Sequence, residues 1–177
     1  MSGSSEIIID NILNRRSVRN FTGRDFDHGM LTTLLKAAMA APSARNRQPW
    51  AFVVVTEREL MDIMAYGLPY TKMLYKAAAA IIVCGDLTID LQQGATDLWY
   101  QDAAAASQNI LLAAHALGLG AVWSALYPYE DRSGLVKQTL GLPEHVTPFS
   151  IIPLGLPTGE DLPKDKYKPE RIHWNKW

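Results

Sequence analysis

The sequence predicts an α/β or α+β protein, in which helices cover a β-sheet, on three observations. Short runs rich in β-branched residues alternate along the chain with longer segments of helical periodicity. The 177 residues suit one domain, 1–177, and no fixed-period repeat or flexible linker divides them. Hydrophobic residues make up 48% of the chain, which is enough for a sizeable core. The direction of the strands is left open.

Two helices are expected before the first strand. The first begins at Ser5, a suitable N-cap, and ends near Arg15, and isoleucine and leucine recur in it at every fourth position. The second starts after Asp27 and stops before Pro42, because proline has no amide hydrogen to continue the helix. Residues 1–4 are expected to be a frayed end or an added leader.

Strands and helices then alternate. Thr56 and Glu59 have the spacing of a capping box, which opens a helix directly after a strand of β-branched residues. Gly118 and Gly120 end the longest helix, which is apolar on nearly all sides and therefore expected to be central. The expected elements are a loop at 42–49, strands at 50–55, 80–84, 121–126 and 149–154, and helices at 56–66, 97–117 and 133–140.

The last segment, 156–177, is predicted to be extended. It is rich in proline and lysine, and its large apolar side chains show no helical period. Aromatic side chains such as Trp174 and Trp177 are usually buried, so we expect this tail to pack against a partner subunit.

Composition and motifs exclude several classes of protein. A formal net charge of -1 argues against a nucleic-acid groove, and no apolar run reaches the length of a membrane-spanning helix. The lone Cys84 cannot form an internal disulfide, and no cysteine or histidine cluster has metal-ligand spacing. The chain is therefore expected to be cytoplasmic, without a metal, and to bind neither nucleic acid nor membrane. The run 118–123 begins like a dinucleotide-binding motif, but Trp123 replaces its third glycine.

Three stretches could carry a site. The first, 15–19, offers guanidinium groups and a hydroxyl that suit phosphate, although basic residues also suit a helix C-terminus. The second, 42–50, places amides and a hydroxyl between two prolines, as a heterocycle site or an ordinary turn would. The third, 118–125, joins glycines to a buried strand, which a helix C-cap also explains.

Together, the blocks RRSVRNF, APSARNRQPWAFVVV, GLGAVWSALYP and IIPLGLP resemble the flavin-dependent nitroreductase family, in the family's order and over nearly the whole chain. The resemblance implies an α+β fold with a central sheet flanked by helices. It also implies an intertwined homodimer whose C-terminal extension lies on the partner, with FMN at the subunit interface and NADH or NADPH as electron donor.

The resemblance carries specific residues with it. The first FMN-contacting segment corresponds to Arg15, Arg16, Ser17 and Arg19, with Arg19 nearest the pyrimidine edge of the flavin. The loop that reaches the flavin from the other subunit corresponds to Pro42, Ser43, Ala44, Asn46 and Gln48. Backbone donors beside flavin N5 correspond to Trp123, Ser124 and Ala125. The basic residues that complete the phosphate pocket correspond to Lys166 and Lys168, with Lys164 or Arg171 as substitutes, and Lys72 lies where some members keep a lysine near the flavin.

The implied activity is electron transfer from NAD(P)H through flavin N5 to a small organic acceptor, of nitroaromatic or quinone type, in a ping-pong cycle. The cofactor supplies the chemistry, so no catalytic side chain is required. The sequence leaves the acceptor and the choice of NADH or NADPH open. The alternatives are a flavoprotein of the same fold with another chemistry, such as enone reduction, dehalogenation or oxidative flavin breakdown, and a non-catalytic FMN-binding module.

Overall fold

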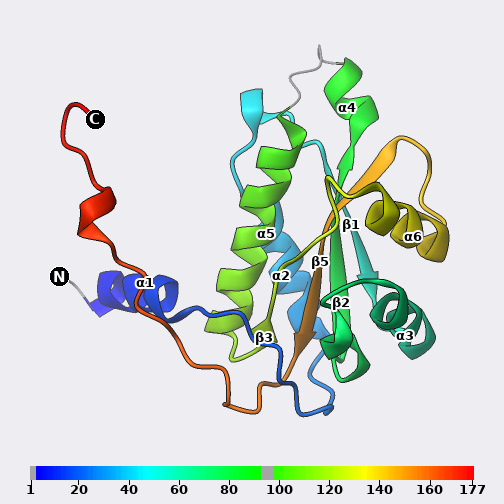
Figure 1. Cartoon of the computed structure of the whole chain (residues 1–177), viewed down its shortest axis with the longest axis horizontal. Coiled ribbons are helices and arrows are strands. Elements are labelled where there is room, and N and C mark those ends of the chain that lie inside the picture. The colour runs from blue at the N-terminus through cyan, green and yellow to red at the C-terminus, as the bar shows by residue number, and fades with distance from the viewer. Residues whose placement is uncertain (1–2, 93–97) are drawn as a thin grey trace.

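The computed structural model describes residues 3–92 and 98–177 and has an α+β fold (Figure 1). Its sheet runs in the order β1-β2-β5-β3, and every pairing is antiparallel. The three long strands are β1 (Trp50–Val55), β2 (Ala79–Asp86) and β5 (Val146–Gly155). Two short strands, β3 (Gly120–Ala121) and β4 (Ser124–Ala125), pair with β5. The α+β fold with a sheet flanked by helices is therefore confirmed.

Helices cover both faces of the sheet. Ile81 of β2 packs with α2 (Gly29–Met39) and α5 (Trp99–Ala116), whereas its neighbour Ile82 packs with α3 and α6 on the other face. The bounds of the latter helices are α3 (Arg58–Gly67) and α6 (Glu130–Leu140). Cys84 points to the same side as Ile82, and burial raises the pKa of its thiol to about 12, so it is not a nucleophile at neutral pH.

Two local predictions are wrong. The expected capping box at Thr56 and Glu59 does not form, because α3 begins at Arg58 and its N-cap is Glu57, which makes no side-chain capping bond. The expected strand 121–126 is divided into β3 and β4. The register places the break opposite Ile152 and Pro153, and proline has no amide hydrogen to give to a strand ladder.

Other boundaries differ by a few residues. Helix α1 spans Gly3–Asn14 and thus includes two residues of the expected frayed end, while residues 1–2 lie outside the described residues. The predicted start of the long helix, Asp97, also lies outside them. Elements that the sequence did not predict are α4 (Leu87–Gln92) and the short 3₁₀ turns η1 (Ala44–Asn46), η2 (Lys72–Tyr75) and η3 (Pro169–Arg171).

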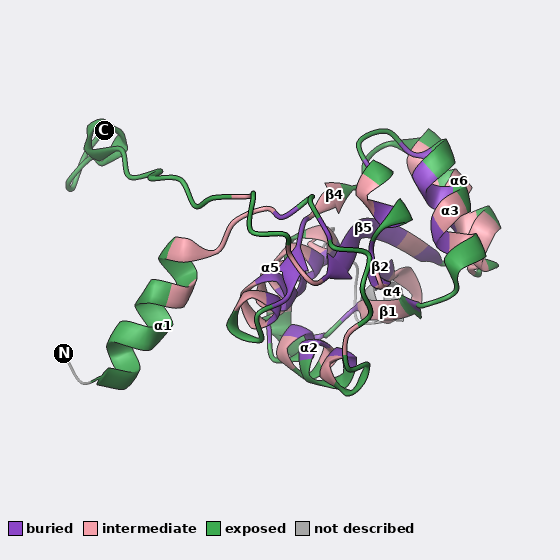
Figure 2. Cartoon of the chain, turned by 90° about the horizontal axis from the view of Figure 1, so that it is seen from below, coloured by how far each residue is buried: buried purple, intermediate pink, exposed green. Residues whose placement is uncertain are grey.

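Two segments project from the body of the molecule: helix α1 and the tail 156–177. Both are coloured almost entirely as exposed in Figure 2 and extend to the same side. None of the residues that form α1 is buried, and Trp174 and Trp177 of the tail are 84% and 100% exposed. We call α1 and the tail the arms. Of the helices in the described residues, none is long and apolar enough to cross a membrane.

Candidate functional site

The arginine segment, 15–19, is hydrogen-bonded to β3 at the edge of the sheet. The Val18 amide donates a hydrogen bond to the Ala121 carbonyl oxygen over 2.9 Å, and Phe21 forms an isolated bridge with Pro157. A side chain at Gly120 would place its Cβ 2.6 Å from Val18 Cγ1, so the glycine lets the segment approach β3 closely. The first and third stretches of the sequence therefore lie next to each other.

Arg16 is held by two groups from distant parts of the chain. Its Nε donates to the Asp161 carbonyl oxygen over 3.0 Å, and its Nη1 lies 3.4 Å from His115 Nδ1. Burial lowers the pKa of His115 below its ordinary value, and the charges of Arg16 and Arg15 lower it further against an opposing effect of Asp10. A neutral His115 can accept a hydrogen bond from Arg16 through Nδ1.

A cavity of about 580 Å³ with both apolar and charged lining residues lies where the end of α1 meets the tail. It brings together the cationic side chains of Arg15, Lys164 and Lys166 and the carboxylate of Asp165, with Asn14 and Gln108 beside them. Within the described residues, the Arg15 guanidinium makes no hydrogen bond or ion pair. Three positively charged side chains around one cavity are suited to bind a phosphate group.

The loop between α2 and β1 is held in an unusual backbone conformation. Arg45, Asn46 and Gln48 all have positive φ values, of 53°, 55° and 53°. The Gln48 amide donates to Ser43 Oγ over 2.9 Å, and the Gln48 side chain donates to the Asn46 side-chain oxygen over 3.2 Å. Positive φ values in residues other than glycine are uncommon and cluster at functional sites, which favours a binding role over an ordinary turn.

This loop and the arginine segment lie at opposite ends of α5. The Ala44 amide donates to the carboxylate of Asp102, which is buried in the first turn of α5, whereas Arg16 contacts His115 in the last turn. A rise of 1.5 Å per residue separates these two turns by about 20 Å. Figure 1 shows the cyan loop near one end of α5 and the blue segment near the other. One chain therefore does not bring the two stretches into one site.

The third stretch lies on the sheet beside an aromatic cluster. The Trp123 and Phe149 rings meet edge to face, with centroids 5.4 Å apart. Ser124 pairs with Ile151 and Ala125 with Ser150, and Arg132 donates to the Ala125 carbonyl oxygen over 3.2 Å. The backbone next to Trp123 is thus fixed by the sheet and lies two residues from the anchor of the arginine segment.

The other predicted residues contribute less to these contacts or are exposed. The Lys72 ammonium lies 5.7 Å from the ring centroids of both Tyr66 and Tyr75. Lys168 is the N-cap of η3 and does not line the cavity that holds Lys166. Pro42 and Arg19 are exposed, and so is Gln48. The Ser17 hydroxyl is half-buried and makes no hydrogen bond to any residue that the structure describes.

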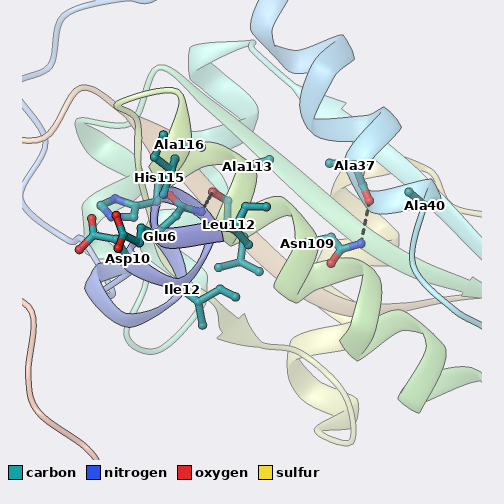
Figure 3. Close-up of a pocket in the computed structure, with 13 residues that line it drawn as sticks. Glu6, Asp10, Ile12, Ala37, Ala40, Asn109, Leu112, Ala113, His115 and Ala116 are labelled. Atoms are coloured by element: carbon teal, nitrogen blue, oxygen red, sulfur yellow. Dashed lines mark hydrogen bonds between the residues drawn. The ribbon is translucent and has the colours of Figure 1, made fainter. Parts of the chain in front are cut away.

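A larger groove, of about 900 Å³, separates α1 from α5 and α2 (Figure 3). Its walls are mainly apolar and include Ile8, Ile12 and Leu112. Two asparagines brace it: Asn11 donates to the Leu112 carbonyl oxygen over 3.1 Å, and Asn109 donates to the Ala37 carbonyl oxygen over 2.9 Å. The groove is therefore lined mainly by apolar groups, with Glu6, Asp10 and His115 among its polar residues.

Comparison with known proteins identifies the family. The family model described as the nitroreductase family matches residues 12–70 and 61–156, which together are most of the chain. The chain belongs to the nitroreductase family. A relative from Methanothermobacter thermautotrophicus, with the provisional name NADH dehydrogenase/NAD(P)H nitroreductase, is 44% identical over 170 residues, which are 96% of this chain and 87% of the relative.

Solved nitroreductase structures share the fold over nearly its full length. A protein from Parabacteroides distasonis, provisionally named NADH dehydrogenase/NAD(P)H nitroreductase, superposes with a TM-score of 0.91 at 46% identity and covers 97% of this chain and 99% of its own. A structure from Desulfovibrio desulfuricans, provisionally named a nitroreductase in complex with FMN, has a TM-score of 0.82 at 29% identity, with 96% and 97% covered.

This nitroreductase-family chain also uses residues that the sequence did not single out. Asp102 fixes the loop 42–48 through Ala44, and Asp161 contacts the arginine segment from the tail. Their partners lie 58 and more than 140 residues away in sequence. No local pattern marks such carboxylates, because their role depends on contacts made only after folding.

Proposed function

We propose that the chain is an FMN-dependent oxidoreductase that acts as a homodimer and passes electrons from NADH or NADPH to a small organic acceptor of nitroaromatic or quinone type. Membership of the nitroreductase family supports this proposal, as do the FMN named with the Desulfovibrio desulfuricans structure and the NAD(P)H named for the Methanothermobacter relative. The observation that carries it is the cationic cavity of Arg15, Lys164 and Lys166 beside the arginine segment.

The residues present fit an FMN phosphate. Arg15, Lys164 and Lys166 line the cavity. We therefore assign to Lys164 the phosphate-binding role that the sequence predicted for Lys168. Such cations form charge-assisted hydrogen bonds with phosphate oxygens. The exposed guanidinium of Arg19 is available to the pyrimidine edge of the flavin, where a positive charge stabilises developing negative charge.

Bound FMN supplies the redox chemistry, hydride acceptance and donation, and the protein holds and orients it. The sheet fixes the backbone at Ser124 and Ala125, directly after Trp123, and we assign Trp123 and Ser124 to the flavin edge. No nucleophilic side chain is needed. Donor and acceptor use one site in turn, which predicts ping-pong kinetics.

The distance between the two ends of α5 supports the proposed dimer. The loop of Pro42, Ser43, Ala44, Asn46 and Gln48 lies about 20 Å from the arginine segment of its own chain, so a second copy must supply it to complete a site. The arms offer the surface for that copy. Ile8 of α1 is 61% exposed and lines the apolar groove beside α5, and the tail tryptophans are more exposed still.

The first test is the spectrum of the purified protein, recorded before and after anaerobic addition of NADH and of NADPH. A flavin spectrum that is bleached by either donor supports the oxidoreductase. Bound flavin that stays oxidised indicates the non-catalytic module, and a protein that does not bind FMN contradicts the proposal. Rates with quinones and nitroaromatics, compared with enones and halophenols, separate the alternative chemistries.

The phosphate assignment is tested by Arg15→Ala. Loss of a charged hydrogen bond costs roughly 1.5 to 3 kcal/mol, so FMN should dissociate about tenfold to a hundredfold more readily. The matched control is Arg24→Ala, an exposed arginine outside the segment, which should bind FMN like the wild type. Equal FMN affinity of Arg15→Ala and the control would remove Arg15 from the site.

The dimer is tested by Ile8→Asp. A charge in the groove face of α1 should weaken the dimer at least about tenfold, because burying an unpaired carboxylate is costly. Ile63→Asp changes an isoleucine of α3 that is 43% exposed on the body, and it should leave the dimer intact. Sedimentation velocity measures both. A wild-type monomer that binds FMN tightly would contradict a shared site.

A further inference from the structure

Asp161 forms a set of hydrogen bonds to the arginine segment. Its Oδ2 accepts from the backbone amides of Arg19 and Asn20 over 3.1 and 3.0 Å, and from the Asn20 side-chain amide over 3.3 Å. Its own carbonyl oxygen accepts from Arg16 Nε over 3.0 Å. One residue of the tail thus contacts both ends of a segment more than 140 positions earlier in sequence.

The surroundings of Asp161 set it apart from the rest of the tail. From residue 158 to residue 177 every residue is exposed except Asp161, which is half-buried. The Thr22 amide donates a hydrogen bond to the Leu156 carbonyl oxygen over 2.9 Å, and the Thr158 amide donates to the Asn20 carbonyl oxygen over 3.0 Å. These two bonds hold the tail next to the arginine segment just before Asp161. The carboxylate therefore ends a short, specific pairing of the tail with the arginine segment.

We propose that Asp161 is a positioning residue that fixes the arginine segment in the conformation that binds FMN. This inference rests on the proposed function. The Asp161 carboxylate accepts from two backbone amides and from the Asn20 side chain, and it makes no hydrogen bond to the guanidinium groups of Arg15 and Arg19. In the part of the chain that the structure describes, the Arg15 and Arg19 guanidinium groups make no hydrogen bond, so they stay available to the cofactor.

The physical basis is preorganisation. Residues 15–20 form no helix or strand, so their conformation depends on tertiary contacts. Two successive backbone amides donate charge-assisted hydrogen bonds to the Asp161 carboxylate, which restricts this backbone before the cofactor binds. A site that is already ordered loses less conformational entropy when the cofactor binds. Asp161 would thereby determine both the affinity for FMN and the position of Arg19 near the flavin.

The test compares Asp161→Ala, Asp161→Asn and Glu160→Ala in the full chain. FMN affinity is measured by fluorescence titration of the apoprotein, and the reduction potential of bound FMN by anaerobic dye equilibration. Asparagine keeps an oxygen that can accept both amides but has no charge. Glu160→Ala removes the neighbouring carboxylate, which makes no contact with the arginine segment in the described residues.

We expect Asp161→Ala to bind FMN about tenfold more weakly, the effect of losing one hydrogen bond of ordinary strength, and to lower its reduction potential. The potential should fall because a misplaced Arg19 stabilises the reduced, anionic flavin less well. Asp161→Asn and Glu160→Ala should match the wild type in both measurements. The rescue by asparagine distinguishes positioning from a charge effect, which would raise the potential in both Asp161 variants.

Two results would overturn the inference while leaving the proposed function intact: wild-type FMN affinity in Asp161→Ala, or equal changes in the alanine and asparagine variants. A wild-type protein without FMN affinity would instead overturn the proposed function. If Asp161→Ala does not fold, amide hydrogen exchange of the wild-type protein tests the inference instead. The Arg19 and Asn20 amides of the wild type should be protected, and rapid exchange there would show that the carboxylate does not hold the segment.

Discussion

Strand β2 and helix α1 contain similar apolar residues but bury them to opposite extents. Ile81 and Ile82 of β2 are both 0% exposed, because the two faces of the sheet pack against different helices. Ile7 and Ile8 of α1 are 71% and 61% exposed. The body buries a core within one chain, whereas none of the residues of α1 is buried. An apolar sequence pattern thus marks a surface to be buried and does not say which chain buries it.

The difference has a consequence for stability. Residues of the body contribute to folding of the single chain, and in the proposed homodimer residues of the arms would contribute through association. Stability from association depends on protein concentration by mass action, and stability from an internal core does not. Matched substitutions in the two regions can therefore separate the contributions.

The largest expected effect is that of Ile82→Ala. Truncation of a fully buried isoleucine should lower the free energy of unfolding by about 2 to 5 kcal/mol, with the same loss at every protein concentration. Ile8→Ala is the matched change in the arms. Its loss should shrink as the protein is diluted, which urea denaturation at two concentrations would show. A concentration-independent loss for Ile8→Ala would place α1 in the internal core.

A smaller effect is expected from Gly85→Ala. A Cβ at this position would lie 2.3 Å from Trp99 Cε3, and the Trp99 ring is packed against Tyr127 and Phe149 and cannot move freely. Overpacking of this kind costs about 1 to 3 kcal/mol. Gly3→Ala in α1 has nothing within 4 Å of the new Cβ and should change stability by less than about 0.5 kcal/mol. Thermal unfolding of both variants measures the contrast, and equal shifts would contradict it.

The smallest effect is expected at His115, where the arms join the body. Because the folded protein holds the pKa of His115 below the ordinary value of 6.5, the unfolded chain takes up the proton first as the pH falls. The contribution is therefore complete above pH 6.5 and is lost below it, down to the pKa of the folded state. His115→Gln should lose less stability than the wild type over this interval. Parallel curves for the two proteins would show that His115 does not contribute.

Much of the body could be predicted from the sequence. Runs of β-branched residues predicted β1, β2 and β5, Pro42 marked the end of α2, and a long segment that is apolar on nearly all sides and ends at glycines predicted α5, because these patterns depend on neighbours a few residues apart. The four sequence blocks predicted the nitroreductase family, which is confirmed. The residues assigned to FMN, the homodimer and the cytoplasmic location stay predictions.

Only the tertiary structure decided how these parts are arranged. The antiparallel direction of the strands, the division of 121–126 by Pro153 and the exposure of α1 all depend on partners distant in sequence. So do the two carboxylates of the candidate site. Asp102 holds the loop at one end of α5, and Asp161 holds the arginine segment at the other. The sequence by itself determined which segments become helices, strands and binding stretches, because local propensity and spacing are written in adjacent residues. Which stretches share a site was decided by folding, since a hydrogen bond across 140 residues leaves no local pattern.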